Sequence, residues 1–430
     1  MEPSNEADVG PILFDPQQAT PEWACSVASR LEQNTWAGVK ALAGVLPAAT
    51  ATAILDALGK LLKHEPTLVE VVPGSPAVSV TVVGDTHGQL HDVLEMLRQV
   101  GNPSAERLFV FNGDFVDRGA WGLETLMVLA CWKLALPRSV VLLRGNHESS
   151  TCTALYGFRA ELEAKYGKKH YKGVYSSCLK AFAALPLAAL IAQATLVLHG
   201  GLFRKPASAS KQNKTGNKRK RGPARSGKAP LLVGSLDDLR KSGKGGRDPN
   251  GAGFTVLATD VLWSDPVATP GVTVNDARGV GLIFGPDVTK QFLEENALRL
   301  ILRSHEGPDA RFKRDDMPSV DSGYALDHTS ESGQLMTVFS APDYPQFQDV
   351  AAGERYDNTG AVAVLTAPGY SQPEMKQFRA VLPRPQVEAY YEYQDVPDSD
   401  EEIELGAGPG VSDMSASELS LGGPRPSRCV

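Results

Sequence analysis

The sequence of 430 residues predicts an α/β fold with a buried, parallel β-sheet. Short apolar runs each end at a polar motif: VSVTVV before Gly84, LFVFN before Gly113 and VVLL before Arg144. Such runs are typical of buried strands that lead into loops. The segments between them, such as QLHDVLEMLRQV, carry apolar residues at helical spacing. Alternation of strand and helix favours parallel strands with helices packed on their faces.

Three polar motifs follow these predicted strands: GDTHGQ at 84–89, GDFVDRG at 113–119 and RGNHE at 144–148. Ligands of open α/β sheets bind beyond the carboxyl ends of the strands. We therefore expect the polar side chains of the three motifs to lie close together at one edge of the sheet. These side chains are Asp85, His87, Asp114, Asp117, Arg118, Asn146 and His147.

The remaining elements follow in order along the chain. Residues 21–64 show helical spacing, and TLVL, LRLILRSHE, LMTVFSAPDYP and AVAVLTA read as further strands. The basic run after Phe203 and the acidic, Ser/Gly-rich end contain too few large apolar residues to offset the entropy of ordering. The predicted organisation is a disordered N-terminus (1–20), a helical cap (21–77), a main domain (78–380) with a disordered basic insert (204–230), and a disordered acidic tail (381–430).

Composition indicates the charge, the redox environment and the membrane association expected of the protein. The net charge is −7, and five scattered cysteines form no CxxC pair, which is typical of free thiols in a reducing compartment. The N-terminus has no apolar segment of the signal-peptide kind. The most apolar stretch, 181–199, is interrupted by Pro186 and Gln193, so we expect no membrane span.

Six residues at predicted strand ends have metal-binding side chains. Two carboxylates, three imidazoles and one amide oxygen suit a pair of divalent ions of intermediate hardness, with manganese expected first and iron or zinc as alternatives. The absence of a thiolate argues against a structural zinc site. Asp114, at the end of the central strand, is the natural bridge between two ions. The six are Asp85, His87, Asp114, Asn146, His199 and His305.

The other polar residues suit phosphoryl chemistry. Guanidinium groups grip phosphate oxygens bidentately, and Arg118 and Arg278 are the candidates. His147 can protonate a leaving alkoxide, and Asp117 can orient His147 and keep it protonated. Tyr344, in the loop after a strand, can offer its phenol to the phosphate.

Taken in order, GDTHGQ, GDFVDRG, RGNHE, HGG, WSDP, RSHE and FSAPDY resemble the motifs of PPP-type serine/threonine protein phosphatases. The resemblance covers most of the chain, and the basic insert, GAWGLET and SAPDYPQFQ are similar to the plant-type protein phosphatase seven group. It implies a metallophosphoesterase-like central β-sandwich flanked by helices, with a dinuclear metal site at the carboxyl ends of the strands.

The resemblance also implies the roles of the site residues. Asp85 and His87 would hold one ion, and Asn146, His199 and His305 the other, with Asp114 between them. The acid pair would be Asp117–His147, and phosphate would be bound by Arg118, Arg278, Asn146 and Tyr344.

The implied activity is hydrolysis of phosphoserine and phosphothreonine in protein substrates by a metal-bridging hydroxide. The alternative enzyme is a dinucleoside polyphosphate hydrolase on the same metal core, against which the long C-terminal half argues. A nuclear scaffold with a dead site would require a missing metal ligand, and none of the six is missing.

The basic run KRKR, Lys218–Arg221, leaves several interpretations open. It can bind a nuclear import receptor, bind calmodulin or another regulator, or be a solvated loop. The calmodulin interpretation needs apolar anchors, which LLVGSLDDLRK at 231–241 could supply. We expect a location in the nucleus and/or cytoplasm, phosphoprotein partners, and neither a membrane nor a specific nucleic acid as partner.

Overall fold

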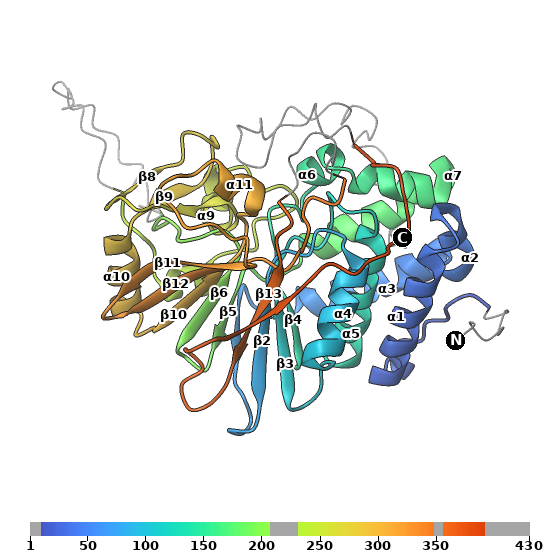
Figure 1. Ribbon diagram of the computed structural model, residues 1–430, viewed down its shortest axis with the longest axis horizontal. Coiled ribbons are helices and arrows are strands. Elements are labelled where there is room, and N and C mark those ends of the chain that lie inside the picture. Colours follow the sequence, from blue (N-terminus) through green and yellow to red (C-terminus); the bar gives the residue numbers. More distant parts are fainter. Residues whose placement is uncertain (1–9, 207–230, 348–355, 392–430) are drawn as a thin grey trace, which may run out of the picture.

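The computed structural model describes residues 10–206, 231–347 and 356–391, and it consists of two stacked β-sheets flanked by helices (Figure 1). The predictions of disorder for the first nine residues, for most of the basic insert and for the tail beyond Tyr391 lie outside the described residues. The sandwich expected from the resemblance is thus the framework of the chain.

The first sheet has five strands in the order β14-β13-β2-β3-β4. Strands β2, β3 and β4 are parallel, as predicted, while β13 and β14 join antiparallel. Helices α4 and α5 follow β2 and β3. The bounds are β2 Ser79–Val83, α4 Leu90–Val100, β3 Arg107–Phe111, α5 Gly122–Ala135, β4 Val140–Leu142, β13 Gly360–Leu365 and β14 Glu374–Phe378.

The second sheet has six strands in the order β1-β5-β6-β10-β12-β11, of which β6, β10 and β12 run parallel. Three of the strands predicted from the later part of the chain, β6, β10 and β12, therefore build another layer, whereas the fourth, β13, extends the first sheet. The bounds are β1 Leu68–Val71, β5 Ala188–Ile191, β6 Thr195–Leu198, β10 Leu300–Arg303, β11 Tyr324–Ser330 and β12 Gly333–Val338.

The alternating directions of side chains along the strands explain why the two sheets and the helices stack in layers. In β3, Val110 is buried with Val197 and Leu302 of the second sheet, whereas Phe109 and Phe111 are buried among the helices. In the second sheet, Ile301 faces away from the sandwich and packs with the helices of the other flank. Since neighbouring side chains of a strand point to opposite faces, each sheet is apolar on both sides and is covered on both.

The N-terminal helices cover the first sheet from outside, together with α5 and α7 (Figure 1). Thr20 begins α1 by accepting a hydrogen bond from the Trp23 N–H at 3.2 Å, and Pro21 occupies the first turn. The bounds are α1 Pro21–Thr35, η2 Val39–Ala41, α2 Leu42–Val45, α3 Ala48–Lys63, α6 Ser150–Leu155 and α7 Phe158–Phe182.

Among the described helices, none by itself is long and apolar enough for a membrane span. The bent pair 39–45 and 48–63 passes the same criteria of length and composition only when taken together.

Two predicted boundaries at the N-terminal end are wrong. Residues 10–20 are not disordered: Ile12 is buried, its N–H donates to the Val45 carbonyl at 2.7 Å, and η1 spans Pro16–Gln18. The helical cap ends before residue 77, because β1 pairs with β5 at the edge of the second sheet. In both segments a short apolar run is buried against the rest of the domain.

In the part of the chain that the structure describes, a third, small sheet β7-β9-β8 lies beyond the second sheet, with four α-helices and one short 3₁₀-helix. Here too a predicted boundary is wrong, because Arg204, the first residue of the expected insert, forms an ion pair with buried Asp260 at 2.7 Å. Arg204 also bridges Val233, and the Lys205 N–H donates to the Leu232 carbonyl at 2.7 Å. The bounds are α8 Leu236–Lys241, η3 Gly253–Thr255, α9 Val256–Trp263, β7 Asp265–Pro266, β8 Val272–Val274, β9 Leu282–Phe284, α10 Pro286–Glu295 and α11 Pro308–Phe312.

The predicted disorder of the C-terminal tail is wrong for residues 381–391. The Val381 N–H donates to Asp92 at 2.7 Å, and the Arg384 guanidinium lies 3.4 Å from the same carboxylate. Tyr390 packs against the helical core on this side of the molecule. A buried acid of α4 therefore fixes the chain after the last strand and directs it over the helices.

Candidate active site

The predicted metal-binding residues do meet, at the place where parallel strands of both sheets end. Asp85, Asp114 and Asn146 follow β2, β3 and β4, while His199 and His305 follow β6 and β10 of the second sheet. All five are buried. The site is therefore shared by the two layers of the sandwich, which the strand order of the first half alone did not reveal.

Asp114 lies at the centre of the cluster. Its Oδ2 is 3.3 Å from His199 Nε2 and 3.8 Å from His87 Nε2. Two sets of donor atoms converge within 4.8 Å, and Asp114 belongs to both: it lies with His87 and His147 in one set, and with His199 and His305 in the other. Asp114 thus occupies the bridging position that the sequence predicts.

The donors that remain unused fit bound cations. Asp85 Oδ1 and His305 Nε2 are buried and have no hydrogen-bond partner among the described residues. The Asn146 amide oxygen is 2.7 Å from His199 Nε2 and 3.0 Å from His305 Nδ1. Carboxylate, imidazole and amide donors in this arrangement are the ligands that divalent ions of intermediate hardness take.

The imidazoles of the cluster differ in the direction of their pKa shifts. Burial disfavours the imidazolium of His199, yet the carboxylates of Asp114 and Asp85 raise its pKa to about 9. Burial lowers the pKa of His87 to about 3 and that of His305 well below its usual value. The last two imidazoles are therefore neutral, which is the form that binds metals.

The backbone around the site is unusual. His87, Asp114 and His305 have φ values of 41°, 51° and 77°, in the left-handed region that non-glycine residues seldom adopt. Glu148 holds the Asp114 turn in place: its carboxylate accepts hydrogen bonds from the N–H groups of Asp114, Phe115 and Gly145, each at 2.8 Å. This role of Glu148 was not predicted from the sequence, although Glu148 closes the RGNHE motif.

The predicted acid pair is formed. His147 Nδ1 lies 2.8 Å from Asp117 Oδ2, and Asp117 Oδ1 accepts the Phe158 N–H at 2.9 Å. Burial lowers the pKa of His147 to about 4, and Asp117 orients the imidazole through this hydrogen bond. A phosphate dianion bound nearby would supply the negative charge that favours the imidazolium.

Arg118 is buried, and its Nε and Nη2 have no hydrogen-bond partner among the described residues. Its guanidinium carbon lies 4.2 Å from the centre of the Tyr156 ring. Buried charged donors without partners are costly, so the group is suited to an anion. Tyr344 is also buried, with its ring centre 5.1 Å from that of His87, and it lines the same region.

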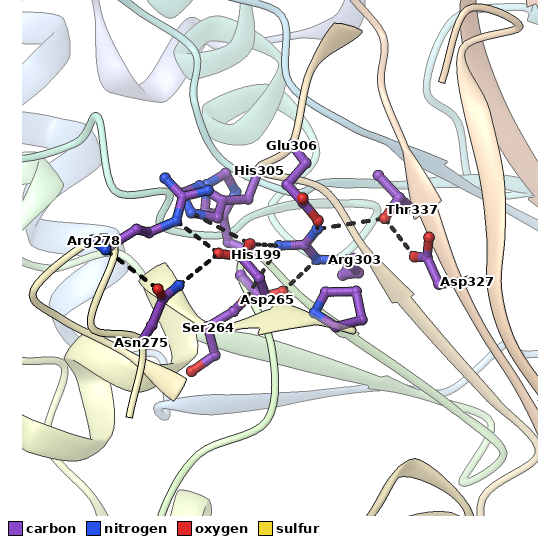
Figure 2. A network of polar contacts seen from close by, with 12 residues as sticks. His199, Ser264, Asp265, Asn275, Arg278, Arg303, His305, Glu306, Asp327 and Thr337 are labelled. Atoms are coloured by element: carbon purple, nitrogen blue, oxygen red, sulfur yellow. Dashed lines mark hydrogen bonds and ion pairs between the residues drawn. The ribbon is translucent and has the colours of Figure 1, made fainter. Parts of the chain in front are cut away.

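Arg278 reaches the site through a polar network, which Figure 2 shows around Asp265. Asp265 Oδ2 accepts from Arg278 Nε at 2.7 Å, and its Oδ1 accepts from Arg303 Nη2 at 2.9 Å. Arg303 continues to Glu306 at 2.6 Å. His305 Nε2 lies 3.9 Å from Asp265, so the network touches the cluster directly. The WSDP motif contains Asp265, but no pattern in the sequence indicates that Asp265 positions Arg278.

A cluster of buried metal donors beside buried arginines and an imidazole–carboxylate pair defines a metal-dependent phosphoesterase. The sequence profile of the calcineurin-like phosphoesterase family matches residues 78–309, and the chain belongs to this family. Within it, the predicted PPP-type resemblance is confirmed by the relatives.

The chain is 45% identical to serine/threonine-protein phosphatase 7 of Arabidopsis thaliana, over 90% of this chain and 94% of that protein. It is 37% identical to human serine/threonine-protein phosphatase 5, over 68% of this chain and 48% of the human protein. Among solved structures, a Saccharomyces cerevisiae serine/threonine phosphatase with similarity to human PP5 has a TM-score of 0.61 at 30% identity, covering 81% of this chain and 95% of that one.

We predict that Asp265→Asn raises the KM for an aryl phosphate about tenfold, with a smaller change in kcat, because Arg278 loses a charged hydrogen-bond partner. Steady-state kinetics with an aryl phosphate checks this. Asp237→Asn, at an exposed surface ion pair, is the matched control. An unchanged KM in a folded Asp265→Asn variant would contradict the positioning role of Asp265.

Proposed function

We propose that the chain is a metal-dependent protein phosphatase that hydrolyses phosphoserine and phosphothreonine. The observation that carries this proposal is the buried cluster around Asp114, in which Asp85 Oδ1 and His305 Nε2 have no hydrogen-bond partner among the described residues. Nε and Nη2 of the buried Arg118 have none among those residues either. The printed names of the plant, fungal and mammalian relatives support protein serine and threonine phosphates as the substrate class.

Two divalent ions complete the proposed site, with manganese expected first and iron or zinc as alternatives. Asp85 and His87 would hold one ion and Asn146, His199 and His305 the other, with Asp114 shared. When bound, such a pair lowers the pKa of water and neutralises phosphoryl oxygens.

The chain's own residues would bind and orient the phosphate ester. Arg118 Nε and Nη2 would donate to its oxygens, and Arg278, held by Asp265, would grip a second face. Asn146 Nδ2, buried and without a partner among the described residues, would add another donor. Tyr344 would offer its phenol from the rim.

His147 would transfer the proton. Because Nδ1 faces Asp117, Nε2 is the nitrogen available to protonate the serine or threonine oxygen as it leaves phosphorus. Asp117 holds the ring in the required orientation through its second contact with the Phe158 N–H.

We predict that His147→Ala lowers kcat for phosphate release from a phosphoserine peptide by about 10²- to 10⁴-fold, the usual contribution of a general acid. His170→Ala, an exposed histidine of α7, is the control. Turnover of diadenosine tetraphosphate is measured alongside to test the alternative substrate class. Faster turnover of the dinucleotide, or a fully active His147→Ala variant, would refute the proposal.

We predict that dialysis against a chelator abolishes activity and that manganese restores it, because the neutral imidazoles and carboxylates of the cluster act only through bound cations. Metal analysis should give two ions per active chain. Asp114→Asn should lower this content, since both sets of donor atoms include Asp114. Full activity with fewer than two ions per chain would contradict a dinuclear site.

The basic run and the location of the protein are separate proposals. We propose that Lys218–Arg221 binds an import receptor and places the protein in the nucleus as well as the cytoplasm. The predicted calmodulin anchors are not available at 236 and 239, because Leu236 and Leu239 are buried in the core beyond the second sheet. Leu232 of the same segment is exposed, so a regulator that binds the basic run would use this residue rather than Leu236 or Leu239.

We predict that replacing the four basic residues at 218–221 with alanine moves a fluorescently tagged protein out of the nucleus and leaves peptide phosphatase activity within twofold. Import signals depend on clustered positive charge, whereas the catalytic cluster lies elsewhere. Imaging together with assay of the purified variant checks both parts. Unchanged nuclear signal would exclude this run as the import signal.

A further inference from the structure

We propose that Tyr391, on the segment after the last strand, positions the phosphate-binding guanidinium of Arg118, so that this C-terminal segment is part of the substrate site. The inference rests on the proposed function and deepens it. It assigns a substrate-site role to a residue far outside the segment 78–309 that matches the family profile.

Arg118 is held mainly by its backbone and by aromatic rings. Its φ is 67°, and its N–H donates to the Tyr156 carbonyl at 3.1 Å. The guanidinium carbon lies 4.2 Å from the centre of the Tyr156 ring and 5.7 Å from that of Tyr391. Both distances are within the range of cation–π attraction.

Aromatic contacts suit a phosphate-binding arginine. A carboxylate partner would occupy the N–H groups at the edge of the guanidinium and compete with phosphate. A ring attracts the cation through its face and leaves those N–H groups available, and in Arg118 Nε and Nη2 are indeed unused among the described residues. Tyr391 and Tyr156 can therefore restrain Arg118 while leaving its Nε and Nη2 available for phosphate.

Tyr391 is itself firmly placed. Burial raises the pKa of its phenol, although the charge of Arg118 and a hydrogen bond with Arg118 oppose the shift. A side chain at Gly157, whose φ is 111°, would approach the Tyr391 ring to 3.0 Å and the Tyr390 Cβ to 3.5 Å. This close packing requires a glycine at position 157.

The same turn also serves the acid pair. Phe158, next to Gly157, donates its N–H to Asp117, the partner of His147. The C-terminal segment therefore packs on the turn that orients His147. Its last described tyrosine, Tyr391, contacts the phosphate-binding Arg118. Its start is fixed independently, through Val381 and Arg384 on Asp92.

The test compares Tyr391→Leu and Tyr391→Phe in the full-length, metal-loaded protein. Leucine removes the ring, so the KM for a phosphopeptide and the inhibition constant of inorganic phosphate should both rise about 3- to 30-fold, while kcat stays within about threefold. Phenylalanine keeps the ring and should restore both constants to within twofold. Leu382→Ala, exposed on the same segment, is the control.

Two results would overturn the positioning role: unchanged constants in Tyr391→Leu, or equal defects in Tyr391→Leu and Tyr391→Phe. A lower KM in Tyr391→Leu would also overturn it, because the ring would then obstruct the site. If Tyr391→Leu fails to fold, Tyr391→Trp replaces it and should bind phosphate at least as tightly as the parent.

Phosphate binding is also measured as the rise in melting temperature with added inorganic phosphate, which needs no turnover. A parent protein that is stabilised by phosphate but inactive on phosphopeptides would refute the proposed function alone. Loss of this stabilisation in Tyr391→Leu, and its return in Tyr391→Phe, would still support the inference.

Discussion

The structure depends on burial of the Asp114 carboxylate between two β-sheets. An isolated buried charge is strongly unfavourable, so every neighbouring group has to compensate it. His199 does so by its raised pKa, the His147 N–H by a 2.9 Å hydrogen bond, and Glu148 by fixing the turn that presents the carboxylate. A pair of divalent cations would satisfy the same requirement more completely, which makes metal binding and local stability two aspects of one constraint.

The groups that compensate the charge of Asp114 must be held rigidly. The network at the end of the second sheet holds them. Asp265 joins the guanidinium groups of Arg278 and Arg303, and Arg303 continues to Glu306. The network lies behind His305 and fixes the ends of β7 and β10 relative to each other. Left-handed backbone at His87, Asp114 and His305 is tolerated because these turns are held by hydrogen bonds from several directions.

Much of this could be predicted from the sequence, because strand ends followed by Gly-Asp or Asn-His motifs are local signals. They place Asp85, Asp114 and Asn146 at one edge without any knowledge of long-range contacts. The features that could not be predicted depend on contacts between residues far apart in the sequence. No periodicity indicates that β6 and β10 belong to a separate sheet, that Glu148 accepts three backbone N–H groups, or that Tyr391 returns to Arg118. The buried state of Ile12 was missed for the same reason, since the short apolar run at 12–14 does not show which of its side chains is buried.

The joined ends of the basic insert have an evolutionary consequence. Arg204 and Val233 bridge each other, Lys205 and Leu232 share a hydrogen bond, and Asp260 anchors Arg204, so the chain leaves and re-enters the domain at one point. The entropy of closing a loop rises slowly with length, by about 0.6 kcal/mol for each doubling. Sequence can therefore be lengthened, shortened or exchanged at this hairpin neck with little effect on the folded body. During evolution, localisation signals or binding motifs can therefore be added at this position without changing the catalytic site.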